Sequence, residues 1–277
     1  MPLSLSVVVT TYNWPEALAV VLESLSRQSD RDFEVVVADD GSREETAALI
    51  RRFAADFPVP LKHAWQPDQG FRAAASRNRA IEAASGDYIV FIDGDCFVLP
   101  DFVAVNRRLA EAGWFVSGKR SYLRQGLSQR ILGGRAPFGL GSRLVWFARS
   151  LLNQCTRPAE FVHRGDGAFR KKQAADWEKV QTCNLGVWRS DCLKVNGFDE
   201  RYVGHGLEDS DFVLRLIRSG VRRKLGNNAS LVLHLNHERR DRPPESKNAE
   251  LFAALAAGSG FRAGVGLAEA AGAVSRS

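Results

Sequence analysis

Short apolar runs rich in β-branched and aromatic residues recur through the first hundred residues of the chain. Runs of this kind, bounded by glycine, proline or charged residues, are typical of buried strands. They predict strands at residues 5–10, 33–38, 61–65 and 88–92. The first run has no basic stretch before it and leads directly into Thr10. We therefore expect a first strand there and no export signal.

The segments between these strands carry apolar residues at helical spacing. The first helix is predicted to begin near Pro15 and to place its leucines and valines between residues 18 and 25 on one face. Further helices are expected at 44–57 and 73–84. This alternation predicts an α/β fold with a Rossmann-like, mostly parallel central sheet and helices on both faces.

Polar residues follow three of the predicted strands. They are Thr11-Tyr12-Asn13, Asp39-Asp40-Gly41-Ser42 and Asp93-Gly94-Asp95. Because the carboxyl ends of parallel strands meet at one edge of a sheet, we expect these residues to converge on one crevice. Asp93 and Asp95 repel each other unless a cation lies between them, so they indicate a divalent metal, with an ordinary acidic turn as the alternative. Asp39 or Asp40 is suited to accept from a nucleoside base or a sugar hydroxyl.

The segment before the fourth strand has features of a ligand-binding loop. Gly70 and the small residues after it permit close approach of backbone to a ligand, and Arg72 or Arg77 is suited to face a phosphate. The alternative is an alanine-rich helix start with an exposed arginine. No glycine-rich loop follows the first strand, which argues against a dinucleotide site or a P-loop.

Taken together, these motifs resemble the nucleotide-sugar domain of family 2 glycosyltransferases of GT-A fold. Residues 184–188, 197–200 and 204–212 are similar to the acceptor half of those enzymes and of the related galactosyltransferases. The resemblance covers roughly residues 3–120 and 180–240. It implies a nucleotide-sugar half at 1–117, a basic, partly helical insert at 118–180, an acceptor-binding half at 181–240 and a helical, then loosely ordered tail at 241–277.

The resemblance also implies which residues bind the donor. They are Thr11, Tyr12, Asn13, Asp39, Asp40, Gly70, Arg72, Arg77, Asn78 and Asp93. It further implies that Asp93 and Asp95 bind Mn²⁺ or Mg²⁺, with His234 as a third ligand and His237 as the second choice. Carboxylate oxygens suit such hard cations, which neutralise a departing diphosphate. Two ordinary histidines near a strand end are the alternative.

By the same resemblance, Asp209 is the catalytic base that takes the proton of the acceptor hydroxyl, and Glu208 positions the acceptor. Acidic residues also favour a helix amino terminus, and both interpretations can hold together. The expected activity is a metal-dependent, inverting transfer from a nucleotide sugar, with a UDP-sugar favoured. The expected acceptor is a hydroxyl of a glycan or glycolipid in bacterial cell-surface polysaccharide or lipopolysaccharide synthesis. A nucleotidyltransferase is an alternative that the separate Glu208-Asp209 motif disfavours.

The positive charge of the chain is concentrated in one region. Net charge is +6, and residues 118–172 contain 12 lysines and arginines but only Glu160 and Asp166 as acids. The apolar stretch at 144–152 within this region predicts an interfacial helix on an anionic membrane or glycolipid, with an ordinary packed surface helix as the alternative. Nucleic-acid binding without transferase activity is a further alternative, but the carboxylate turns would repel phosphate.

The remaining features concern the compartment. The four cysteines form no CxxC pair, which favours reduced thiols in a cytosolic protein. No apolar run approaches the ~20 residues needed to cross a bilayer. We expect a cytoplasmic protein that can also lie peripherally at the inner face of the cell membrane. A helix is expected at 248–257 and a loosely held tail at 258–277.

Overall fold

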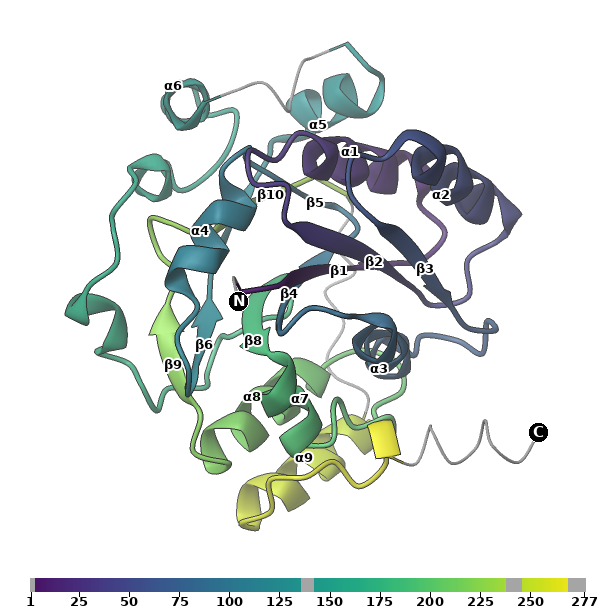
Figure 1. Cartoon of the computed structure of the whole chain (residues 1–277), viewed down its shortest axis with the longest axis vertical. Coiled ribbons are helices and arrows are strands. Elements are labelled where there is room, and N and C mark those ends of the chain that lie inside the picture. Colours follow the sequence, from purple (N-terminus) through teal and green to yellow (C-terminus); the bar gives the residue numbers. More distant parts are fainter. Residues whose placement is uncertain (1–2, 136–141, 238–245, 269–277) are drawn as a thin grey trace.

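A computed structural model describes residues 3–135, 142–237 and 246–268. Its centre is a seven-stranded sheet in the order β3-β2-β1-β4-β8-β6-β9 (Figure 1). The strands are β1 Leu5–Thr11, β2 Phe33–Asp39, β3 Leu61–Trp65, β4 Tyr88–Asp93, β6 Trp114–Ser117, β8 Asn184–Trp188 and β9 Arg222–Leu225. The first four are parallel to one another, whereas β8 runs antiparallel to both of its neighbours, β4 and β6. The predicted α/β fold with a mostly parallel sheet is confirmed.

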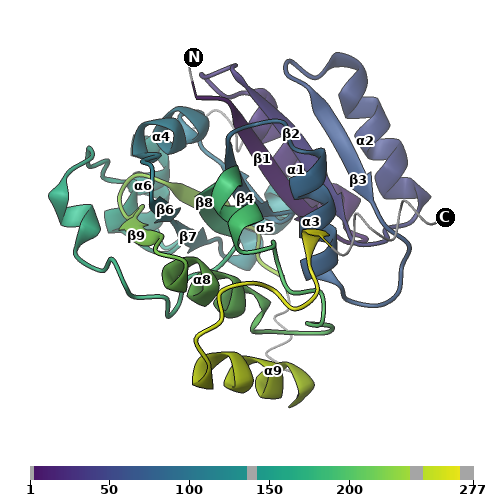
Figure 2. The same ribbon diagram turned by 60° about the horizontal axis from the view of Figure 1, so that its bottom comes forward.

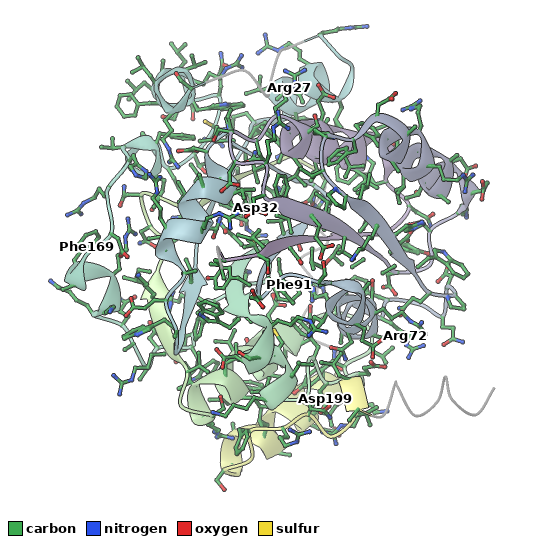
Figure 3. All side chains as sticks on the ribbon, in the orientation of Figure 1. Arg27, Asp32, Arg72, Phe91, Phe169 and Asp199 are labelled. Carbon is green, nitrogen blue, oxygen red and sulfur yellow. The ribbon has the colours of Figure 1, made fainter. Side chains whose placement is uncertain are left out.

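Helices cover both faces of this sheet, because successive residues of a strand point to opposite sides. Val7 and Val9 of β1 pack with α1 and α2, while Val8 packs with α3 and α8. Phe91 of β4 lies at the centre of the molecule (Figure 3), edge-on to Phe212 of α8. The helices around this sheet are α1 Pro15–Ser26, α2 Glu44–Asp56, α3 Ala73–Ala83, α4 Phe102–Leu109, α7 Arg189–Lys194 and α8 Glu208–Arg218.

A second sheet of three short strands lies beside the first and was not predicted. It consists of β5 Cys96–Val98, β10 Leu231–His234 and β7 Lys119–Tyr122, with β10 in the middle. Strands of three or four residues are too short for a hydrophobic alternation to be recognised. The pairing places His234 opposite both Cys96 and Tyr122, and therefore beside the end of β4.

The basic region is partly helical, as expected. It contains α5 Gln125–Leu132, α6 Arg143–Leu151 and two short 3₁₀ helices, η1 Pro158–Phe161 and η2 Ala168–Lys171. The buried Arg170 fastens this region to the core by donating to the carbonyls of Leu225 and Asn227. On α6, Trp146 is buried while Leu144 and Leu151 are exposed.

The carboxyl-terminal region corrects one prediction. Helix α9, Ser246–Ala257, lies at the periphery (Figure 2), but the segment after it returns to the core. Ala263 and Leu267 are buried, and Gly264 N–H donates to Asp199 at 2.9 Å. Asp199 lies beside this yellow segment in Figure 3. The described part of the expected loose tail is therefore packed, because its small residues fit closely against the turn at Asn196; residues 269–277 lie outside the described residues.

All four cysteines are buried as free thiols. No helix in residues 3–135, 142–237 or 246–268 is both long and apolar enough to cross a membrane.

Candidate active site

A pocket of about 1090 Å³ opens at the carboxyl ends of β1 and β4. It brings together polar residues that lie far apart in the sequence. We call Thr11, Asp40, Asp93 and Asp95 the strand-end wall, because each lies at or just beyond the end of a parallel strand. Tyr12 and Phe71 line the same pocket and leave about half of their surface exposed.

Gly94 allows Asp93 and Asp95 to be placed so close to β1. Its N–H donates to the Thr10 carbonyl at 2.7 Å, and a Cβ at this position would lie 2.8 Å from that oxygen and 3.1 Å from Thr11 Oγ1. Any larger residue would force the chain away from β1. The two carboxylates that flank this glycine then meet different partners.

Asp95 lies beside two histidines. Its Oδ2 is 3.3 Å from His234 Nε2 and 3.1 Å from His237 Nε2, and the ligand atoms of the three residues all lie within 4.8 Å of one another. Burial alone would raise the pKa of Asp95, but the hydrogen bond from His237 and the charge of His234 outweigh it and lower the pKa. A carboxylate and two imidazoles are a suitable ligand set for a divalent cation, and their nitrogens favour Mn²⁺ over Mg²⁺.

Arg77 contacts three carboxylates of the pocket: Asp93, Glu208 and Asp209. Its side chain is buried, with Nη1 3.2 Å from Glu208 Oε1 and 3.4 Å from Asp209 Oδ1, and Nη2 3.8 Å from Asp93 Oδ1. Burial would lower the pKa of Arg77, but the charges of these three carboxylates outweigh this effect and raise the pKa, so the guanidinium stays charged. The side chain of Arg77 lines the pocket, so a contact between Arg77 and a phosphate stays a prediction, although its Nη1 already meets Glu208 and Asp209.

Asp93 and Glu208 are both poor acids in this setting. Burial and the charge of Asp95 together raise the pKa of Asp93 to about 7, although the charge of Arg77 opposes the shift. Burial and the neighbouring Asp209 likewise raise the pKa of Glu208. Both groups therefore gain from a cation placed in the pocket.

Asp209 is held in the first turn of α8. Thr182 donates to both of its oxygens, from N–H at 3.1 Å and from the hydroxyl at 2.7 Å. The preceding Leu207 has φ 74°, a left-handed conformation that is costly for a branched side chain and turns the helix start into the pocket. Asp211, in the same helical turn, forms instead a buried ion pair with Arg215 at 2.6 Å. Only the first two acids of α8 thus enter the pocket.

Several predicted donor-binding residues lie outside the pocket lining, and the first group supports the loops. Asp39 is fully buried, accepting from Ser42 N–H at 2.8 Å and lying 2.8 Å from His63 Nε2. Asn13 accepts from the N–H of Arg43 at 2.9 Å. These side chains shape the turns after β1 and β2, whereas Asp40 reaches the pocket.

The second group lies around α3. Asn78 is buried, and its amide bonds the backbone of Phe198 in both directions, at 2.9 and 2.8 Å. Asn78 was expected to contact the donor, but its amide is buried and already hydrogen-bonded to the backbone of Phe198. The backbone N–H of Arg72 donates to Asp40, while its side chain bonds Gln69. Gly70 has φ 81° and forms the turn before them.

Four further cations line the pocket and were not individually predicted to do so. We call Lys119, Arg120, Arg157 and Lys179 the basic wall. The sequence indicated an excess of basic residues between 118 and 172, but not which of them face the pocket. Thr182 carried no recognisable signal at all, since a lone threonine before a strand is common.

Comparison with known families matches both halves of the chain. The model described as Glycosyl transferase family 2 matches residues 6–175. The model described as N-terminal domain of galactosyltransferase matches residues 167–238, which contain Glu208, Asp209 and His234.

Curated relatives and solved structures agree with these matches. Chondroitin synthase of Escherichia coli is 29% identical over 243 residues, covering 78% of this chain and 32% of the relative. Validoxylamine A glucosyltransferase of Streptomyces hygroscopicus is 30% identical over 235 residues, covering 78% and 52%. The chain thus spans between about a third and a half of these two relatives.

Among solved structures, the mannosyltransferase PcManGT from Pyrobaculum calidifontis, in complex with GDP-Man and Mn²⁺, aligns with a TM-score of 0.59 at 20% identity, over 85% of this chain and 58% of that one. S. aureus TarS 1–349 in complex with UDP-GlcNAc aligns with a TM-score of 0.55 at 15% identity, over 86% and 60%. These likenesses show the fold.

Proposed function

Because this chain belongs to glycosyltransferase family 2, we propose that it is a metal-dependent, inverting enzyme that moves a sugar from a nucleoside diphosphate sugar to an acceptor hydroxyl. One observation carries the proposal. A metal-ligand set at Asp95 and a potential base at Asp209 line the same pocket, and the charged Arg77 contacts both Asp209 and Asp93. Donor activation and acceptor deprotonation have to take place in one pocket, and the base must lie opposite the leaving group.

The donor diphosphate is proposed to lie at the strand-end wall. Asp95, His234 and His237 would hold Mn²⁺, and a bound divalent cation would neutralise the charge on the leaving diphosphate. Tyr12 and Phe71 offer exposed rings for a nucleobase, and Asp40 offers an acceptor for its N–H groups. Asp93 is placed to accept from the ribose or from a metal-bound water.

Asp209 is proposed to act as the base. As the acceptor oxygen attacks the anomeric carbon, its proton passes to Asp209 and the bond from that carbon to the diphosphate breaks. Thr182 fixes the carboxylate through both oxygens, which keeps it oriented toward the pocket. A single displacement of this kind inverts the anomeric centre. Glu208, one residue earlier, would position the acceptor.

A UDP-sugar is the favoured donor, and a glycan or glycolipid of the bacterial cell surface is the favoured acceptor. Relatives named chondroitin synthase and hyaluronan synthase support a polysaccharide acceptor. The solved neighbours hold GDP-Man in one case and UDP-GlcNAc in another, so both nucleotides need to be tested.

The test is a thermal-shift and hydrolysis screen of UDP-, GDP- and dTDP-sugars with and without Mn²⁺. We expect one nucleotide to raise the melting temperature and only with Mn²⁺, because the diphosphate and the cation bind together. Stabilisation by no nucleotide, or by every nucleotide without metal, would contradict the proposal.

We further propose that α6 attaches the protein to an anionic membrane surface. Leu144, Leu151 and Leu152 expose 73%, 65% and 71% of their surface in the most basic region of the chain. Exposed leucines next to arginines are typical of helices that lie at a lipid interface.

Flotation with vesicles tests this attachment. We expect binding to phosphatidylglycerol vesicles at low salt and not to phosphatidylcholine vesicles. The double substitution Leu151→Ser/Leu152→Ser should abolish it, while Leu193→Ser, at an exposed leucine of α7, should not. Equal loss in both variants would show that α6 is not the attachment site.

A further inference from the structure

We propose that the acceptor carries an acidic group, a phosphate or a carboxylate, and that Lys119, Arg120, Arg157 and Lys179 of the basic wall bind it. The inference rests on the proposed function, because it names a property of the second substrate of the same pocket.

The first support is the absence of ion pairs at these four side chains in the described residues. Within the described part of the chain, none of the four side chains of the basic wall forms an ion pair, although each faces the pocket. Other cations nearby are paired: Lys224 binds Asp166 at 2.6 Å, and Arg223 binds Asp176 at 3.1 Å. Burial lowers the pKa of Lys119, and the charges of Arg223 and Arg157 lower it further. An acidic ligand would relieve this repulsion.

The second support is the backbone. Among the described residues other than glycine, seven have positive φ, and four of these are asparagines, which tolerate it. The other three are Arg157, Lys179 and Leu207, with φ of 59°, 60° and 74°, and all three line the pocket. Conformations of this kind persist where the surrounding structure holds them and are frequent at ligand-binding sites. Two of the cations of the basic wall are thus in this conformation.

The position of the loop at 179–183 indicates the acceptor rather than the donor. Thr182 holds Asp209, and Lys179 lies three residues earlier in the same pocket-lining loop. A hydroxyl that gives its proton to Asp209 therefore lies against this loop. The donor diphosphate has its own cation site at Asp95. Arg120 lies at the border between the proposed acceptor and donor parts of the pocket, since its charge acts to lower the pKa of Asp93.

The experiment compares a double substitution with a matched control. Arg157→Gln/Lys179→Gln removes two exposed charges without removing an ion pair seen in the described residues, and Lys172→Gln removes an exposed charge outside the pocket. Transfer is measured to three soluble acceptors: methyl glucoside, methyl glucuronide and glucose 6-phosphate. Nucleotide-dependent thermal shift with Mn²⁺ is measured on the same samples.

We expect the wild-type protein to use an acidic acceptor with a lower KM than the neutral one. The double variant should raise that KM by about 10-fold for each cation removed, with kcat and the nucleotide shift nearly unchanged. Preference for the glucuronide identifies a carboxylate, and preference for the sugar phosphate identifies a phosphate. Conservative Arg120→Lys, at the half-buried position, should raise KM less than Arg120→Gln.

Two outcomes would overturn the inference while leaving the proposed function intact. One is equal KM for neutral and acidic acceptors. The other is loss of the nucleotide shift in the double variant, which would place the cations at the donor. Absence of any nucleotide shift in the wild-type protein would instead contradict the proposed function itself.

Discussion

The two walls of the pocket differ in how they are built. The strand-end wall consists of residues that directly follow parallel strands, so its geometry is a property of the sheet itself. The basic wall is assembled from β7, from the turn before η1 and from the loop at 179–183, which are separate segments of the chain, and only β7 belongs to a sheet. Under the function proposed above, the first wall would bind the diphosphate of the donor and the second would meet the acceptor. Arg77 and α8 join them.

The largest effect is expected where the walls meet, at Asp209. Asp209→Asn keeps the shape but cannot take a proton, so kcat should fall by about 10³-fold or more. Nucleotide-dependent thermal shift with Mn²⁺ should change little. Asp211→Asn is the control: it breaks the buried pair with Arg215 and should reduce stability rather than the chemical step. A loss of nucleotide binding in Asp209→Asn would show that this residue belongs to the donor site and is not the base.

The second-largest effect is expected from removal of the charge of Arg77. Arg77→Met leaves Asp93, Glu208 and Asp209 without their shared partner, and the free energy of unfolding should fall by about 3 kcal/mol. Urea denaturation without metal measures this. Arg79→Met, at an exposed position of the same helix, should be neutral. If both variants lose the same amount, Arg77 does not hold the walls together.

The proposed metal site, which joins Asp95 of the strand-end wall to two histidines, is tested by His234→Ala. Loss of a metal ligand should weaken apparent Mn²⁺ affinity by about 100-fold or more, since even outer-shell changes cost about 10–100-fold. Titration of the Mn²⁺-dependent activity measures it, and His163→Ala, at an exposed histidine of the basic region, should have no effect. An unchanged Mn²⁺ requirement would leave Asp95 without its proposed partner.

The smallest effect concerns the opposite end of the same sheet. Burial would raise the pKa of Glu34, but hydrogen bonds from Lys62, Ser6 and Ser85 lower it from 4.5 to about 2. Because the folded pKa is depressed, this stability is present above pH 4.5 and is lost as the pH falls toward 2. We expect a loss of about 2 kcal/mol, allowing for the half-exposed Lys62.

Urea unfolding at pH 7 and at pH 3 tests this expectation. In Glu34→Gln the difference between the two pH values should shrink, because no carboxylate remains to titrate at that position. An unchanged difference would place the acid sensitivity elsewhere, with the carboxylates of the pocket as the next candidates.

Prediction from the sequence succeeded where local pattern and topology agree. The four parallel strands and their helices were predicted within a few residues, since buried parallel strands read as continuous β-branched runs. The convergence of Asp40, Asp93 and Asp95 followed from strand order alone. The second sheet was missed, because its strands are short and pair residues more than a hundred positions apart.

Side-chain partners marked the limit of the sequence. Arg77 and Asn78 are adjacent and were both expected at the donor, yet one lies beneath three carboxylates and the other bonds the backbone of Phe198. Helical position turns adjacent side chains about 100° apart, so each meets different neighbours. Likewise, Asp209 and Asp211 share a helical turn but only Asp209 reaches the pocket.

The sequence by itself determined the family, the fold class and the acids that occupy the pocket, because these depend on the order of strands and on motifs carried within single segments. The tertiary structure alone decided which cations face those acids, which of them are paired, and that both candidate histidines rather than one lie beside Asp95. Such choices depend on contacts between segments that are distant in the chain, and electrostatic energies depend on distance and burial rather than on sequence position.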